Sequence, residues 1–145
     1  MSDAKAEAEA EQLMNDALPF AKQMLVKHGE FFPYGMAMQL DGKVMAVATD
    51  DARNYPRSTD MIADLKKAFI EGARARKYKA TALVYDARVV VPKTGSRSDA
   101  IAVSLDHRDG YSVVVFFPYT IEHSTLTIGE AFASSGEKGI FQPLR

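Results

Sequence analysis

Apolar residues recur every three or four positions in two stretches of the chain, which is the spacing of a helix with one buried face. The first stretch predicts a helix over residues 3–28, with Gly29 as its C-terminal stop. Pro19 lies within this pattern and either kinks the helix or splits it in two. The second stretch predicts a helix over residues 58–76, which Ser58 can cap.

Elsewhere, apolar positions alternate with polar ones or run together over lengths typical of strands. Asp41-Gly42 separates the first two such runs and predicts a hairpin closed by a type I′ turn. Gly110 predicts a second tight hairpin before the last run. After that run the pattern weakens, and residues 120–145 are expected to form an extended tail on the domain, with room for one short strand. The predicted strands cover residues 34–40, 43–49, 80–91, 99–106 and 111–118.

The predicted order of elements is helix, two strands, helix, three strands and tail. This order resembles the roadblock or profilin-like class of α+β folds, in which the antiparallel sheet runs 2-1-5-4-3 with the helices on one face. The resemblance spans about residues 10–119 and implies a single five-stranded sheet with two helices. Because it concerns element order alone, it implies a fold and no activity.

The tetrapeptide Phe-Phe-Pro-Tyr occurs twice, at residues 31–34, before the first strand, and at residues 116–119, where the last strand ends. In a 2-1-5-4-3 sheet these two strands are antiparallel neighbours, so both copies would meet at one rim. Proline fits such a place because it cannot donate a hydrogen bond within a sheet. The resulting aromatic cluster is either a structural corner or the lining of a pocket for a ligand or partner. No wider pattern is shared around the copies, so they do not predict an internal duplication.

The composition is that of a globular protein, with 47% hydrophobic and 26% charged residues. A length of 145 residues predicts one domain over residues 1–145, of which 1–12 are polar enough to fray. The net charge of −1 favours neither nucleic acid nor an anionic membrane as a partner. No run of apolar residues predicts a membrane-spanning helix and no secretory signal is recognisable, so we expect a cytoplasmic protein. The absence of cysteine excludes disulfides and thiolate chemistry.

No catalytic motif stands out, and the sequence leaves open whether the protein is an enzyme. Asp86 and Arg88 interrupt an apolar strand two residues apart and so share a face, either as contacts for a ligand or as a surface ion pair. His28, His107 and His123 lack the spacing of metal ligands, so we predict no metal and no cofactor. The candidate residues for binding a ligand or partner are Tyr34, Arg88, Asp86, Tyr119, Phe32 and Phe117.

Alternation along the predicted strands leaves neither face of the sheet polar. If both helices cover one face, the other needs a cover as well. The tail supplies part of that cover, and we predict a homodimer for the remainder. The leading hypothesis is therefore a non-enzymatic module that forms a homodimer or binds another protein. The alternative is a small-molecule-binding domain or weak enzyme with its pocket at the Phe-Phe-Pro-Tyr rim.

Overall fold

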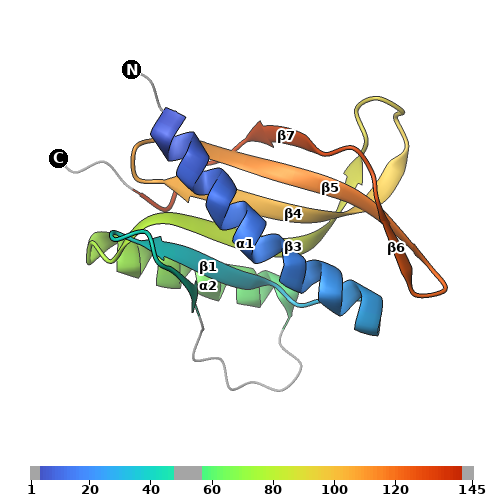
Figure 1. Cartoon of the computed structure of the whole chain (residues 1–145), viewed down its shortest axis with the longest axis horizontal. Helices are drawn as coiled ribbons and strands as arrows, with labels where there is room; N and C mark the ends of the chain where they lie inside the picture. The colour runs from blue at the N-terminus through green and yellow to red at the C-terminus, as the bar shows by residue number, and fades with distance from the viewer. Residues whose placement is uncertain (1–3, 48–56, 142–145) are drawn as a thin grey trace.

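An antiparallel sheet with helices packed against it forms the framework of the protein (Figure 1). The computed structural model describes residues 4–47 and 57–141. Residues 1–3, 48, 49 and 142–145, which belong to predicted elements, lie outside these ranges. The helices are α1 (Ala4–His28) and α2 (Ser58–Arg74). The strands are β1 (Tyr34–Gln39), β2 (Val44–Val47), β3 (Tyr78–Val90), β4 (Arg97–His107), β5 (Ser112–Glu122), β6 (Thr125–Ile128) and β7 (Phe132–Ser135).

Both predicted helices are confirmed, and α2 ends at Arg74, two residues before its predicted end. α1 continues through Pro19 without splitting, and it changes direction along its length in Figure 1. It stops at Gly29, which has a φ of 74° and donates its N–H to the carbonyl of Leu25 at 2.9 Å. α2 begins at Ser58, but its N-cap is Arg57 and no side chain caps it, so the expected Ser58 cap is wrong. Neither of these helices is long and apolar enough to span a membrane.

The sheet runs β2-β1-β3-β4-β5-β6, and β7 pairs with the other half of β5. The predicted α+β class with an antiparallel sheet is confirmed, whereas the order 2-1-5-4-3 is wrong, because β1 pairs with β3 instead of β5. The physical reason lies in β3, which is buried on both faces from Lys79 to Val84. A strand covered on both faces belongs in the middle of a sheet, with a neighbouring strand along each edge. The described sheet has seven strands instead of five, because the tail adds β6 and β7.

The helices lie on opposite faces of the sheet and create two separate cores. Alternation within β3 directs Ala82 and Val84 toward α1, where they join the core that includes Leu13 and Leu25. Leu83 points the other way and packs with Phe69 of α2. The expectation that both helices share one face is therefore wrong. α2 covers part of the face that motivated the predicted homodimer, so that argument is weaker, and the homodimer stays a prediction.

The first predicted hairpin is confirmed, but its turn differs from the one expected. Gly42 has a φ of 92°, whereas Asp41 is not among the described residues with positive φ, so the turn is not type I′. Gly42 donates its N–H to the carbonyl of Gln39 at 2.9 Å, which fits a three-residue loop with a bulge at glycine. The β4–β5 hairpin repeats this design, with Gly110 donating to the carbonyl of His107 at 3.0 Å.

The two Phe-Phe-Pro-Tyr copies lie toward the same end of the sheet, because β1 and β5 run antiparallel. β3 and β4 separate them, as the register Tyr34–Val84, Val84–Val103 and Val103–Val115 shows. The prediction that the copies meet as neighbouring strands is therefore wrong. In the first copy Tyr34 contacts Phe20 of α1, at a ring-centroid distance of 4.9 Å.

Candidate functional site

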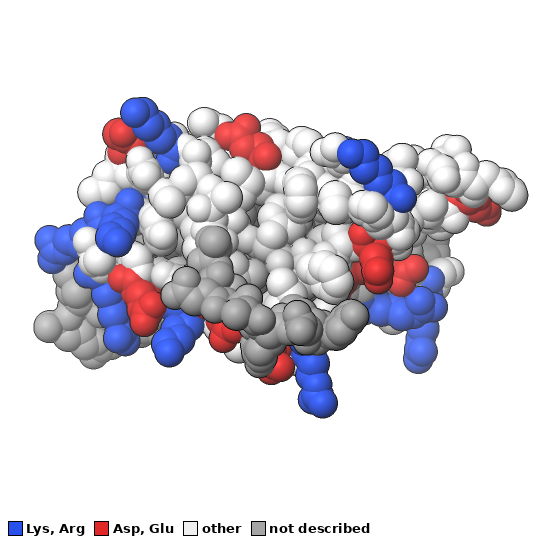
Figure 2. Space-filling view, turned by 90° about the horizontal axis from the view of Figure 1, so that it is seen from below, with Lys and Arg blue, Asp and Glu red and all other residues white. Residues whose placement is uncertain are grey.

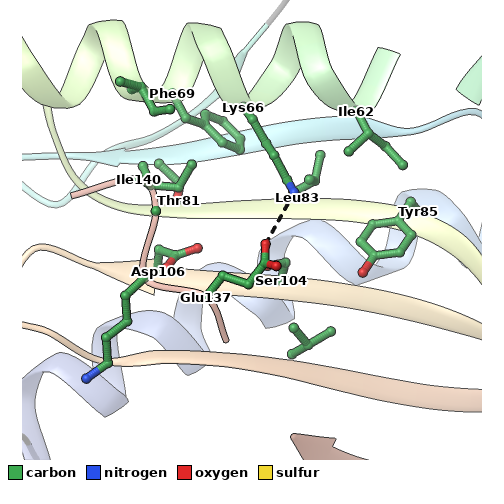
Figure 3. A pocket seen from close by; sticks show the side chains of 14 residues that line it. Ile62, Lys66, Phe69, Thr81, Leu83, Tyr85, Ser104, Asp106, Glu137 and Ile140 are labelled. Carbon is green, nitrogen blue, oxygen red and sulfur yellow. Dashed lines mark ion pairs between the residues drawn. The ribbon is translucent and has the colours of Figure 1, made fainter. Parts of the chain in front are cut away.

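A cavity of about 400 Å³ lies between α2 and the sheet face that this helix covers (Figure 3). It exists because α2 packs on β1, β2 and β3, whereas the sheet continues beyond the helix to β4 and β5. The tail returns after β7 and closes one side with residues 137–140. We call this space the α2 cavity. Its described apolar lining is Ile62, Phe69, Ile70, Leu83, Val114 and Ile140, and its polar side chains are Lys66, Thr81, Tyr85, Ser104, Asp106, Glu137 and Lys138.

Strand register places the polar side chains of the sheet side by side in the cavity wall. Thr81 of β3 lies directly opposite Asp106 of β4, and Leu83 lies opposite Ser104. Because side chains alternate along a strand, Ser104 and Asp106 both face α2, while His107 faces α1. The result is a short polar strip across two central strands that are otherwise apolar.

Asp106 is the charged group of this strip, and it is only 8% exposed. The hydroxyl of Ser112 donates to its Oδ1 at 2.8 Å, and the N–H of Lys138 donates to the same hydroxyl at 3.2 Å. Burial raises the pKa of Asp106, against the opposing effects of the Ser112 hydrogen bond and the positive charge of Lys66. The carboxyl group is therefore harder to ionise than an ordinary aspartate, and it is linked through Ser112 to the tail.

Thr81 is the most unusual group in the wall. It is 1% exposed, and its hydroxyl oxygen has no hydrogen-bond partner among the described residues. A buried polar group left without a partner costs about 1–3 kcal/mol. Such groups are rare in folded proteins and call for a specific explanation, such as a partner that the free chain does not supply.

An ion pair spans the mouth of the cavity. Figure 3 shows Lys66 reaching from α2 toward Glu137 of the tail, with 3.7 Å between nitrogen and oxygen. The side chain of Lys66 is 46% exposed and that of Glu137 is 90% exposed, so this pair contributes little to stability. Burial, and then the negative charge of Glu137, raise the pKa of Tyr85 at the same cavity. The mouth is thus polar and deformable, whereas the wall behind it is fixed by the sheet.

The structure brings together two of the six residues predicted from sequence. Tyr119 of β5 reaches across β4 and donates to Oδ1 of Asp86 on β3 at 2.8 Å. Burial raises the pKa of Tyr119, and this hydrogen bond and the charge of Asp86 raise it further. Arg88 instead pairs with Asp99 at 3.2 Å, where both side chains are more than half exposed and the pair is worth little.

The other three predicted residues have separate environments. Tyr34 hydrogen-bonds to the backbone of α1, donating to the carbonyl of Ala17 and accepting from the N–H of Ala21. Phe32 is 58% exposed, and Phe117 packs against the core on the α1 side. None of the six predicted residues is among the described residues that line the α2 cavity. Their assignment to a binding site stays a prediction.

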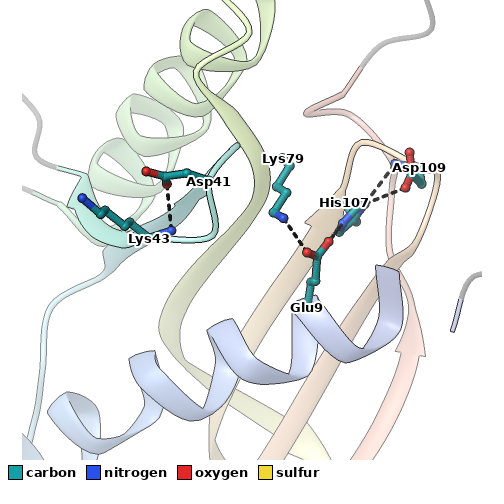
Figure 4. A network of polar contacts seen from close by, with 6 residues as sticks. All are labelled: Glu9, Asp41, Lys43, Lys79, His107 and Asp109. Carbon is teal, nitrogen blue, oxygen red and sulfur yellow. Dashed lines mark hydrogen bonds and ion pairs between the residues drawn. The ribbon is translucent and has the colours of Figure 1, made fainter. Parts of the chain in front are cut away.

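A second polar cluster lies on the α1 face of the sheet (Figure 4). Glu9 of α1 accepts hydrogen bonds from Lys79 and from Nε2 of His107, the latter at 2.9 Å. The backbone N–H of Asp109 donates to Nδ1 of His107 at 3.1 Å, so Nε2 is the ring nitrogen that donates to Glu9. The side chain of His107 is 1% exposed. The cluster fastens the first turns of α1 to β3 and β4 and leaves no room for a substrate at the imidazole.

Further observations limit the chemistry available. In residues 4–47 and 57–141, no group of three or more His, Asp or Glu side chains could hold a metal ion. On the face seen in Figure 2, the described Lys and Arg side chains are interspersed with Asp and Glu, which disfavours a polyanion there. No family model, no curated protein and no solved structure matches the chain. The function must therefore be argued from the residues of the site.

Proposed function

We propose that the protein binds a small organic molecule in the α2 cavity. The single observation that carries this proposal is the buried hydroxyl of Thr81, which lines the cavity without a hydrogen-bond partner in the described structure. The hydroxyl is enclosed in the free protein, so a ligand that hydrogen-bonds to it must displace neighbouring side chains, and in doing so removes the cost of about 1–3 kcal/mol that the free protein bears. The cavity volume of about 400 Å³ lies within the range of small-molecule sites.

The composition of the lining supports binding of a molecule with both apolar and polar parts. Ile62, Phe69 and Leu83 offer an apolar surface, while Asp106 and Ser104 offer polar atoms at fixed positions on the sheet. A concavity that combines apolar walls with polar groups at fixed positions is typical of ligand sites, because the apolar wall provides affinity and the polar groups fix the orientation. This proposal keeps the small-molecule alternative from the sequence but moves it from the Phe-Phe-Pro-Tyr rim to α2.

Binding can be tested with a metabolite panel and one pair of matched variants. Thr81→Val removes the hydroxyl and keeps the shape of the side chain, and Thr127→Val makes the same change at an exposed position on β6. Ligands of the cavity should shift the NMR signals of Leu83 and Ile62 and bind Thr81→Val more weakly than Thr127→Val. Ligand signals confined to other parts of the surface, or no ligand across a broad panel, would remove the proposal.

Binding of another protein is the second candidate, and it has its own observation. Phe20 of α1 is 49% exposed and packs edge-on against Tyr34. Phe32, two residues before Tyr34 in the chain, is 58% exposed. Exposed aromatic side chains gathered in this way are common in interfaces. Sedimentation equilibrium should then show a dimer that Phe32→Ser dissociates. A monomer at every concentration would count against the homodimer.

A further inference from the structure

Asp106 presents one carboxylate oxygen to the α2 cavity without a partner from the described chain. Its Oδ1 accepts from Ser112 at 2.8 Å, and no described residue hydrogen-bonds to the other oxygen. This second oxygen of Asp106 is nevertheless not fully enclosed. Among the described residues, the only side-chain polar atom that is both fully enclosed and without a hydrogen-bond partner is the hydroxyl oxygen of Thr81. Asp106 lines both the α2 cavity and a neighbouring hollow beside residues 107–112, and we assign this oxygen to the α2 cavity.

Three oxygen-bearing side chains meet at this point of the wall. Thr81 is the cross-strand partner of Asp106, and Ser104 lies two residues before Asp106 on the same face of β4. Cross-strand partners lie about 5 Å apart and same-face neighbours about 7 Å apart, measured between Cβ atoms. A ligand atom between Ser104 and Asp106 can therefore reach both of their oxygens directly, and it reaches the enclosed hydroxyl of Thr81 only if neighbouring side chains move. A protonated primary amine carries three N–H donors, which matches this set of acceptors.

Charge favours a cation at this position over an anion. The positive charge of Lys66 acts on Asp106, yet its Nζ pairs with Glu137 at the mouth. The carboxylate inside the cavity is therefore left without a hydrogen-bonded cation. A buried charge is tolerated when it is paired, and an anionic ligand would add a second negative charge beside the first.

We infer that the ligand of the α2 cavity is an organic amine, bound as its ammonium ion to Asp106, Thr81 and Ser104, with an apolar body against Phe69 and Leu83. This inference rests on the proposed function and adds the chemical class of the ligand to it. A charge-assisted hydrogen bond to a carboxylate is about twice as strong as a neutral one. The amine group therefore dominates selectivity, and the apolar walls accept bodies of varied shape.

Three probes with the same body and different head groups test the inference. Phenethylamine is a cation, phenethyl alcohol is neutral and phenylacetate is an anion near neutral pH. Each is titrated into the labelled protein and followed by NMR at Leu83 and Ile62, in wild type, Asp106→Asn and Asp16→Asn. Asp16 is exposed on α1, on the opposite face of the sheet, so its variant makes the same charge change away from the cavity.

Phenethylamine is expected to bind at least about tenfold more tightly than phenethyl alcohol. Asp106→Asn should abolish this difference and Asp16→Asn should preserve it. The alcohol or phenylacetate binding in the cavity as tightly as the amine would overturn the inference and leave the proposed function intact. If no probe and no member of the metabolite panel perturbs the cavity, the proposed function itself fails.

The pH dependence in wild type keeps the test decisive if Asp106→Asn does not fold. Affinity for phenethylamine should fall as the pH drops and Asp106 becomes protonated, whereas affinity for phenethyl alcohol should not. The other described ionisable side chains that line the cavity with Asp106 are Lys66 of α2, Tyr85 of β3, and Glu137 and Lys138 of the tail. A parallel pH dependence for amine and alcohol would contradict the role of Asp106.

Discussion

The hydroxyl of Tyr34 donates a hydrogen bond to the carbonyl of Ala17, inside helix α1, at a distance of 2.6 Å. The same hydroxyl accepts from the N–H of Ala21 at 3.0 Å, and these two backbone groups are the ones that an uninterrupted helix pairs with each other. Pro19 lies between them. A proline and an inserted side chain are both recognised causes of helix bending, and here they act at one turn. Burial raises the pKa of Tyr34 to about 12, which keeps the phenol neutral.

Tyr34→Phe is therefore expected to lower the free energy of unfolding by about 1–3 kcal/mol, because a backbone carbonyl and an N–H lose their shared partner. Urea denaturation measures this change. Tyr111→Phe is the matched control, since it removes the same hydroxyl from a partly buried tyrosine packed against the same core.

The kink provides a second test of this explanation. In a Pro19→Ala background the helix can straighten and pair Ala17 with Ala21 directly. Tyr34→Phe should then cost less than it does in wild type. An equal cost in both backgrounds would show that the hydroxyl does not act by completing the interrupted turn.

Glu9→Gln is expected to lower the free energy of unfolding by about 1–3 kcal/mol at neutral pH, because it leaves the buried ammonium of Lys79 without its counter-charge. Burial alone would raise the pKa of Glu9, but the hydrogen bonds and charges of Lys79 and His107 outweigh it and bring the pKa below its ordinary 4.5. The stability that the carboxylate confers is thus present above pH 4.5 and is lost as the pH falls through the lowered pKa of the folded state.

The difference in stability between wild type and Glu9→Gln should therefore shrink as the pH falls below 4.5. Denaturation curves at a series of pH values measure it. Glu11→Gln, an exposed site on the same helix, should change stability little at any of these values. A difference that stays constant into the acid range would mean that the charge of Glu9 does not bind α1 to the sheet.

The helix and strand periods identified both helices and the first five strands, because the period of apolar positions depends on which side chains meet the core. Pairing between distant strands left no such local trace. The tetrapeptide repeat suggested that β1 and β5 are neighbours, yet β3 takes the central place since Ala82 and Leu83 are buried on opposite faces. The local pattern of apolar positions therefore predicted the elements. Their order in the sheet depended on which strand is buried on both faces.

The tail was expected to hold at most one short strand, and its two strands were not predicted for a different reason. β5 turns into β6 through His123 and Ser124, which have φ values of 50° and 66° without either being glycine. Two successive residues with positive φ close a two-residue hairpin, and the usual sequence signal for that turn is Asn-Gly or Asp-Gly. With neither dipeptide present, the sequence contained no indication of a turn.

The candidate site depended on register in the same way. His107 lay outside the predicted strand 99–106, but both Asp106 and His107 belong to β4 and face opposite sides of the sheet. Asp106 becomes notable only once Thr81 is placed opposite it. A polar residue at every second position, Ser104 and Asp106, in an otherwise apolar strand was the available signal.

Gly72→Ala is expected to destabilise the protein by about 1–3 kcal/mol, although alanine normally favours a helix over glycine. A Cβ at position 72 would lie 2.1 Å from the ring of Tyr78, so α2 would have to move away from β3. Gly139→Ala is the control, because a Cβ there meets nothing within 4 Å. Thermal unfolding measures both, and a stabilised Gly72→Ala would show that α2 is not seated against Tyr78.

Asp106→Asn is expected to raise the free energy of unfolding at neutral pH by about 1 kcal/mol, because the buried carboxylate is kept at a cost to the fold. Burial raises the pKa of Asp106 above its ordinary 3.8, so the folded state disfavours the charge. The cost is absent below pH 3.8 and develops as the pH rises toward the higher pKa of the folded state. Melting temperatures should therefore separate the variant from wild type near neutrality and converge in acid. Destabilisation of Asp106→Asn at neutral pH would mean that the carboxylate supports the fold, and the argument that it is retained for a ligand would fail.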